Sequence, residues 1–204
     1  MSRIHRRLRL LLILASAGAL GCTHHVTPKV TPSKIAAVDP PIASRALLLI
    51  SPAFEEYTSE YSSGVHRWRQ HLGQSVTAAL IDLVGHSFAR SETRRVQDVE
   101  LLQWLSAPAD TTVADVLLVP AFEVGGMRER AFDAVAETRF RLDVRAYHTG
   151  KTYSWPVAGR SARAFSSMRG LTGTALEQAL RGLSDTLAAH RGDLEPPTAT
   201  ASWR

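Results

Sequence analysis

The first 22 residues constrain this chain most, because their pattern belongs to a targeting segment and not to a fold. Four arginines and no acidic residue occupy residues 1–9, an apolar run covers Leu10 to Ala15, and small residues lead on to Cys22. A cationic start, a short apolar run and small residues before a cleavage point are typical of a secretory signal peptide, and the run is too short for a spanning helix. We therefore predict that residues 1–21 are removed and that the rest of the chain forms the fold.

The signal peptide ends on the only cysteine of the protein, Cys22. The stretch Ala19-Leu20-Gly21-Cys22 resembles the lipobox of bacterial lipoproteins, in which the cysteine is lipidated and becomes the mature N-terminus. It departs from that pattern at Ala19, where the family prefers leucine. Thr23 follows in place of the aspartate that often retains lipoproteins in the inner membrane. The resemblance implies lipidation of Cys22 and a place in the outer membrane; the alternative is an ordinary signal peptide cleaved elsewhere.

The charge of the chain is concentrated in the signal peptide. Without residues 1–21, 20 basic residues face 19 acidic ones. This balance argues against a nucleic-acid-binding protein and against membrane attachment through a polybasic surface. Lipid on Cys22 would be the anchor, and it would leave no thiol for a disulfide.

The remaining chain is predicted to hold a single domain between polar ends. Four prolines and scattered Ser and Thr over residues 22–44 predict an extended linker, able to hold the domain up to about 60 Å from the membrane. Residues 45–191 have the usual length of one domain. Residues 192–204, with two adjacent prolines, are predicted to be a disordered tail.

Hydrophobic periodicity predicts an α+β fold. Leu47 to Ile50 indicates a strand buried on both faces, and residues 174–190 form a helix that starts with a Thr174/Glu177 capping box. The predicted elements are a strand at 45–54, a loop at 55–64, a helix at 64–90, a short strand at 94–96, a short helix at 99–105, strands at 113–124, 138–148 and 152–162, and the last helix. Together they indicate a mixed sheet of four to five strands with two main helices packed mostly on one face.

No catalytic or cofactor-binding motif is present in the sequence. His66 and His71 are five residues apart, not the four that place two ligands on one helix face, and His24-His25 fall in the predicted linker. The carboxylates of Glu55, Glu56 and Glu60 are expected to be solvated. We therefore expect a protein that is not an enzyme and binds neither metal nor cofactor.

Two sets of side chains are candidate contact surfaces. Arg139, Arg141 and Arg145 alternate along one face of a predicted strand, which is either a solvated face or a site for an anionic partner such as lipopolysaccharide. Tyr57 and Tyr61 lie in the predicted loop, and exposed aromatic side chains are common at protein interfaces.

The order of elements resembles a group of envelope lipoprotein domains with an anticodon-binding-like α+β fold: the CsgG-like domain of curli secretion, the penicillin-binding-protein activator LpoB and the YajG-type lipoproteins. The resemblance is carried by the strand Leu47–Phe54, the helix at 64–90 and the strand at 116–124. It implies a non-enzymatic outer-membrane lipoprotein, its domain facing the periplasm, that regulates or assembles an envelope complex. The alternatives are a lipopolysaccharide or lipid transport component and, ranked lower, an enzyme acting on glycan.

Overall fold

The central feature of the fold is a five-stranded mixed sheet of order β5-β2-β6-β7-β8. The computed structural model describes residues 23–63, 66–107, 111–130, 133–164 and 168–197. Strand β2 pairs in parallel with β5 and β6, whereas β6, β7 and β8 pair antiparallel. The predicted α+β class and mixed sheet are confirmed. The strand bounds are β2 Ile42–Ile50, β5 Phe88–Arg95, β6 Val116–Arg130, β7 Asp133–Ala146 and β8 Lys151–Ala164.

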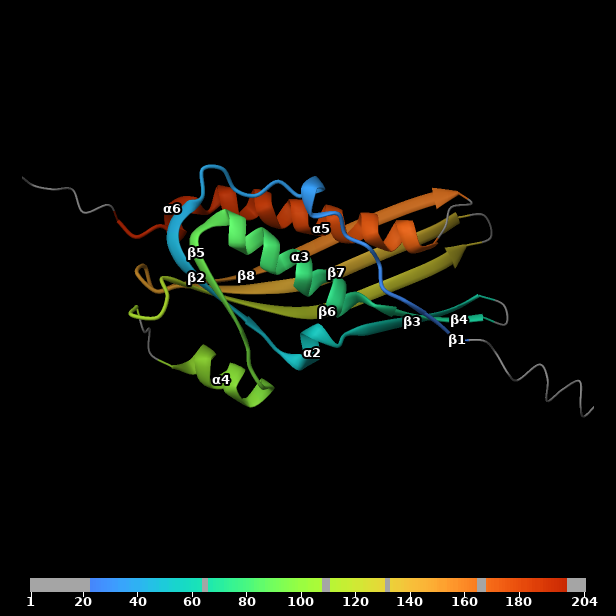
Figure 1. The fold of residues 1–204 in the computed structure, drawn as a ribbon, viewed down its shortest axis with the longest axis horizontal. Coiled ribbons are helices and arrows are strands. Elements are labelled where there is room, and N and C mark those ends of the chain that lie inside the picture. The colour runs from blue at the N-terminus through green and yellow to red at the C-terminus, as the bar shows by residue number, and fades with distance from the viewer. Residues whose placement is uncertain (1–22, 64–65, 108–110, 131–132, 165–167, 198–204) are drawn as a thin grey trace, which may run out of the picture.

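Two helices, α3 (Leu72–Ser87) and α5 (Met168–Ala189), cover one face of this sheet, as predicted (Figure 1). The short helix α4 (Asp98–Ser106) packs on the opposite face, where it meets Leu47, Leu49 and Leu117. Two single-turn helices complete the set of five within the described residues: α2 (Pro52–Glu55) and α6 (Arg191–Leu194).

The apolar patterns of the sequence place the core. Leu48 and Ile50 of β2 face α3 and α5, and Leu47 and Leu49 face α4, so this strand is buried on both faces as predicted. In β7 the apolar series from Phe140 to Ala146 is buried and the arginines between them point outward. Period-two alternation thus separated the core face of the sheet from its wet face correctly.

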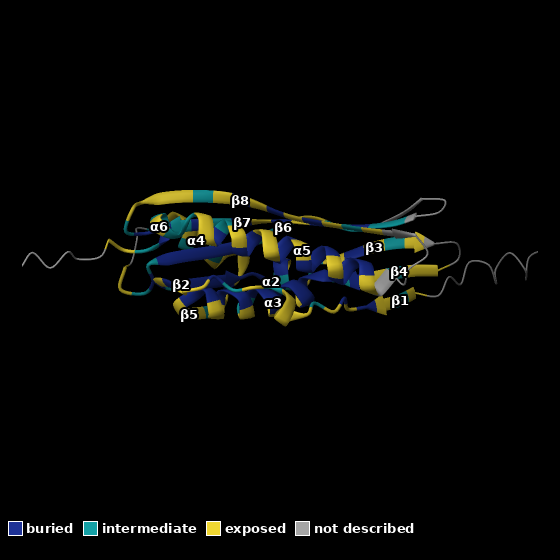
Figure 2. Ribbon diagram, turned by 90° about the horizontal axis from the view of Figure 1, so that it is seen from above, coloured by how far each residue is buried: buried dark blue, intermediate teal, exposed yellow. Residues whose placement is uncertain are grey.

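A second, three-stranded sheet of order β1-β4-β3 was not predicted. Its strands are β1 (Thr23–Val26), β3 (Thr58–Ser63) and β4 (His66–His71), and half of the residues of β1 and of β4 are exposed (Figure 2). The loop predicted at 55–64 is therefore mostly strand, and the helix predicted at 64–90 begins only at Leu72 and ends at Ser87. Trp68, which falls within the predicted helix, instead lies on β4 and stacks on Tyr61 of the facing strand, with ring centroids 6.1 Å apart.

The segment expected to be an extended linker is part of the fold. Residues 23–26 pair with β4, and the following residues cross α3 and α5, including a 3-10 turn η1 (Pro32–Lys34). Helix α3 supplies hydrogen bonds to its backbone at two points: Ser75 Oγ donates to Pro28 O (2.6 Å), and Val38 N donates to Ser87 Oγ (3.1 Å). The prolines stop this segment from forming a helix, but helix side chains satisfy its backbone groups.

The last helix also starts earlier than predicted, at Met168, so Thr174 and Glu177 do not form its cap. Thr174 Oγ donates to Gly170 O (2.9 Å), and the buried Glu177 carboxylate accepts a hydrogen bond from Thr31 N (3.0 Å). Beyond residue 191 the chain forms α6, in which Leu194 is fully buried, so the expected tail begins as packed structure. Residues 198–204 lie outside the described residues.

The molecule is elongated, and strands β6, β7 and β8 run along most of its length (Figure 1). The three-stranded sheet lies at one end, and α6 lies at the other. Helix α4 is nearer to the α6 end.

Within the described residues, no helix combines the length and the apolar character needed to cross a membrane.

Candidate functional site

The most unusual surface belongs to α4, a helix with no fully buried residue. Leu101 and Trp104 are half-buried against the apolar cluster of Leu47, Leu117 and their neighbours. This contact covers one side of the helix only. The helix nevertheless starts in a defined way, because Gln97 N donates to the Glu100 carboxylate (3.1 Å).

Arginines hold α4 and the segments that flank it. Before the helix, Arg95 makes two parallel bonds to Glu55, of 2.9 Å each (Nε to Oε2 and Nη2 to Oε1). At its C-terminal end, Arg145 Nη1 donates to Ala107 O (2.8 Å), and Arg94 lies over the Trp104 ring at 5.8 Å. A guanidinium beside the last carbonyls of a helix satisfies unpaired acceptors and complements the helix dipole.

The chain that returns from α4 into β6 is held by a second paired arginine. Asp115 accepts hydrogen bonds from Arg45 N (2.8 Å) and from Arg45 Nη2 (3.1 Å). Burial raises the pKa of the Asp115 carboxyl, but the hydrogen bonds and charge of Arg45 outweigh it, so the pKa lies below its ordinary value. On the other side of α4, the Arg95 hydrogen bond lowers the pKa of Glu55.

The outer side of α4 is apolar and exposed. Val99 is 64% exposed, Leu102 67% and Leu105 39%. Of the four large apolar side chains that are exposed in the described part of the chain, these are three; the fourth is Val124 on β6. Their spacing of three residues places them along one side of the helix. A concentration of exposed apolar side chains on a polar-rimmed surface is typical of a protein-binding site.

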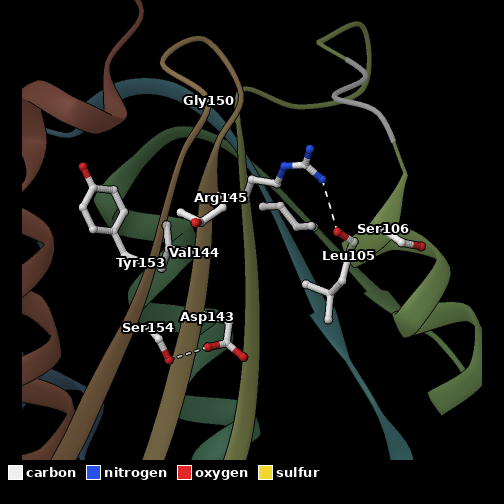
Figure 3. Close-up of a pocket in the computed structure, with 10 residues that line it drawn as sticks. Leu105, Ser106, Asp143, Val144, Arg145, Gly150, Tyr153 and Ser154 are labelled. Atoms are coloured by element: carbon white, nitrogen blue, oxygen red, sulfur yellow. Dashed lines mark hydrogen bonds between the residues drawn. The ribbon is translucent and has the colours of Figure 1, made fainter.

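A depression of about 530 Å³ opens beside this helix, between its C-terminal end and the β7–β8 hairpin (Figure 3). Its walls include Leu105, Asp143, Arg145 and Ser154. Asp143 accepts a hydrogen bond from Ser154 Oγ (2.7 Å), and Arg145 Nη1 reaches Leu105 O (3.3 Å). The depression therefore joins the apolar side of α4 to a polar floor.

The predicted basic face on β7 is neutralised within its own strand. Arg139 pairs with Glu137 (Nη2 to Oε1, 2.9 Å), and Arg141 pairs with Asp143 (Nε to Oδ1, 3.0 Å). Arg145 is engaged with the end of α4 and lies over the Tyr147 ring at 5.3 Å. The three arginines share one face as expected, but they do not form an uncompensated cationic site.

Both candidate tyrosines pack against the fold. Tyr57 stacks on Phe122 with ring centroids 4.3 Å apart, and its hydroxyl accepts a hydrogen bond from Gly125 N (3.1 Å). Tyr61 is half-buried and packs beside the cluster of Met127, Ala136 and Leu171. Tyr57 lies in the connection between α2 and β3, Tyr61 lies on β3, and both side chains are only partly exposed, so their role as a contact surface stays a prediction.

Two histidine pairs link β1 to β4. His24 Nε2 lies 3.0 Å from His66 Nδ1, and His25 Nδ1 lies 3.2 Å from His71 Nε2. Local sequence patterns do not indicate these pairs, because their members are more than 40 residues apart. Each pair has only two potential ligands, and the described residues contain no group of three or more His, Cys, Asp or Glu arranged to hold a metal ion.

The lipidation candidate, Cys22, lies outside the described residues. The described chain starts at the next residue, Thr23, which already belongs to β1. The sequence predicts the short helix but not the α4 surface, because it does not indicate that three of the apolar side chains of this helix are exposed. The one sequence feature that could indicate this exposed side is the number of apolar residues in the helix, which is larger than one buried side of so short a helix can hold.

No family model matches the chain, and no curated protein matches it. Among solved structures, the chain is similar to a Xanthomonas campestris protein of family-model DUF330 (TM-score 0.44, 11% identity, covering 83% of this chain and 95% of that one). It is also similar to the lipoprotein GNA1162 from Neisseria meningitidis (TM-score 0.32, 12% identity, 71% and 99%) and to a PelC dodecamer from Paraburkholderia phytofirmans (0.39, 13%, 73% and 94%).

These likenesses include one bacterial lipoprotein but are too distant to carry an argument about this chain. They do not show a family of CsgG, LpoB or YajG type. That part of the resemblance stays a prediction.

Proposed function

We propose that this protein is an outer-membrane lipoprotein, anchored through Cys22, that acts without catalysis as an adaptor or assembly factor and binds an envelope protein through α4. The main support for this proposal is the exposed apolar side of α4, formed by Val99, Leu102 and Leu105. A helix held in place by four arginines while its apolar side remains in solvent is suited to rigid protein recognition.

Two features favour a protein partner over lipopolysaccharide. The arginines that would recognise an anionic glycolipid are paired with Glu137 and Asp143 or engaged with α4. What remains exposed at this surface is the apolar side of α4, and apolar area of this kind fits the core of a protein interface. Arg145 serves this function indirectly, by positioning the C-terminal end of α4.

The test is crosslinking capture from intact envelopes, with mass spectrometry and fractionation, using native protein and three variants. Leu102→Asp places a charge in the exposed apolar side, and Gln103→Asp places the same charge on the neighbouring exposed residue as a matched control. We expect a defined partner whose capture falls about tenfold with Leu102→Asp, a loss of about 1.4 kcal/mol, and is retained with Gln103→Asp.

The anchor is tested in the same experiment with Cys22→Ala. This variant is expected to be unprocessed or released from the outer-membrane fraction. Equal capture by Leu102→Asp and native protein would contradict the α4 interface, and unchanged fractionation of Cys22→Ala would contradict the anchor.

A further inference from the structure

The structure leaves almost no chain between the predicted anchor and the fold. Cys22 precedes Thr23, the first residue of β1, and consecutive Cα atoms lie about 3.8 Å apart. If the acyl chains on Cys22 are embedded in a bilayer, the start of β1 must lie at its headgroup layer. The inference below rests on the proposed lipid anchor.

The register of the small sheet determines which residues share that position. In the parallel pairing of β1 with β4, Thr23 is opposite Arg67 and His24 is opposite Trp68. His24 also contacts His66, with ring nitrogens 3.0 Å apart, and stacks on Trp68 with centroids 4.4 Å apart. We name His24, His66, Arg67 and Trp68 the membrane-proximal surface.

This surface has the chemistry of a headgroup contact. His66 and Arg67 are exposed, and Arg67 makes no ion pair with any described residue, whereas the neighbouring Arg69 pairs with Glu60 (Nε to Oε1, 2.7 Å). An unpaired guanidinium is well suited to phosphate oxygens. Trp68 is half-buried with its indole nitrogen out of contact with solvent, and it supports His24 by stacking on its ring. Strands β1 and β4, which carry these residues, lie at one end of the long axis (Figure 1).

We propose that the membrane-proximal surface docks on anionic phospholipid headgroups of the membrane that holds Cys22. The docked domain stands on its small sheet, with its long axis leading away from the bilayer. Helix α4, nearer the other end of that axis, is thereby presented to the aqueous side (Figure 1).

The single cysteine makes this orientation measurable. In lipidated protein the thiol of Cys22 is blocked, so an introduced cysteine is the only site for a fluorophore. Ser62→Cys places it on β3 opposite Arg67, and Thr149→Cys places it in the exposed β7–β8 turn. The protein is bound to vesicles of zwitterionic lipid, with or without phosphatidylglycerol, that carry a quencher on a fraction of the headgroups.

We expect strong quenching at position 62 and little at position 149, in vesicles that contain phosphatidylglycerol. Arg67→Gln should lower the ratio of docked to undocked domains on the vesicles about fivefold. Arg90→Gln, which changes an exposed arginine of β5, should leave this ratio unchanged. High salt should weaken docking in the same direction.

The outcomes separate the two proposals. Protein that fails to sediment with vesicles overturns both the anchor and the docking. Protein that sediments, but with equal and weak quenching at positions 62 and 149, keeps the anchor and overturns the docking. Quenching at position 62 that is the same without phosphatidylglycerol, or that is unaffected by Arg67→Gln, overturns recognition of the anionic headgroup.

Discussion

The two sheets of this molecule are stabilised by different interactions. The five-stranded sheet encloses a continuous apolar cluster with α3 and α5, in which residues such as Leu118 and Phe140 are fully buried. The three-stranded sheet is held mainly by partly solvated aromatic stacking, histidine pairs and the Glu60–Arg69 ion pair, with one buried hydrogen bond to α5, from Gln70 Nε2 to Thr172 Oγ1 (3.0 Å). The first sheet therefore supplies the stability of the domain, and the second positions its N-terminal end.

The largest expected effect is in the core of the five-stranded sheet. Phe140→Ala removes a fully buried ring and should lower the free energy of unfolding by about 3–5 kcal/mol. Urea unfolding followed by circular dichroism measures this loss. Val124→Ala, at an exposed position of β6, is the control and should cost under about 0.5 kcal/mol. A loss below about 1 kcal/mol for Phe140→Ala would contradict the assigned core.

A smaller effect is expected where the N-terminal segment crosses the helices. Glu177→Ala removes the acceptor of Thr31 N and should cost about 1–3 kcal/mol. Hydrogen exchange should speed up in residues 31–36 and not in β6. Glu177→Gln keeps an acceptor oxygen and should retain most of the protection; uniform destabilisation of the whole domain by Glu177→Ala would argue against a local role.

Acid should weaken the contact between Arg45 and Asp115, which holds the chain that follows α4. The folded-state pKa of Asp115 lies below its ordinary value of 3.8, so its ionised form stabilises the fold above about pH 4 and this contribution is lost as pH falls through the lowered pKa. Asp115→Asn should be less stable at pH 6 by about 1–2 kcal/mol and lose less stability than native protein between pH 5 and pH 2.5. Parallel pH curves of urea midpoints would refute this.

The smallest effect is expected within the small sheet. Glu60→Gln breaks an exposed ion pair with Arg69 and should change stability by under about 0.5 kcal/mol. Thermal unfolding of native protein and variant at low and high salt tests this. A cost above about 2 kcal/mol would mean that the two sheets are equally important for stability.

The same contrast explains what the sequence could predict. The continuous apolar run Leu47–Ile50 predicts a strand buried on both faces, and the alternation from Arg139 to Arg145 predicts a strand buried on one face. Both strands are present in the structure. The strand His66–His71 has one large apolar residue, Trp68, and its pairing partners lie in other segments. Local patterning cannot record interactions of that kind, and the same limit hid the histidine pairs.

The candidate site was harder to predict than the fold. The apolar residues between positions 99 and 105 predict a short helix, but sequence alone does not say which side of such a helix the sheet will cover. The prolines of residues 28–41 indicated an extended chain correctly, but not the helix side chains, such as Ser75 and Ser87, that bind its backbone. Long-range polar contacts turned an expected tether into part of the domain.

Hydrogen exchange of residues 23–38 in the mature, lipidated protein is the most direct test of the central claim, that the fold begins immediately after Cys22. The structure predicts slowed exchange of the paired amides of β1 and of Thr31 and Val38, whose amides donate to Glu177 and Ser87. Exchange of this segment at the rate of an unstructured peptide would contradict the account and restore a flexible tether between membrane and domain.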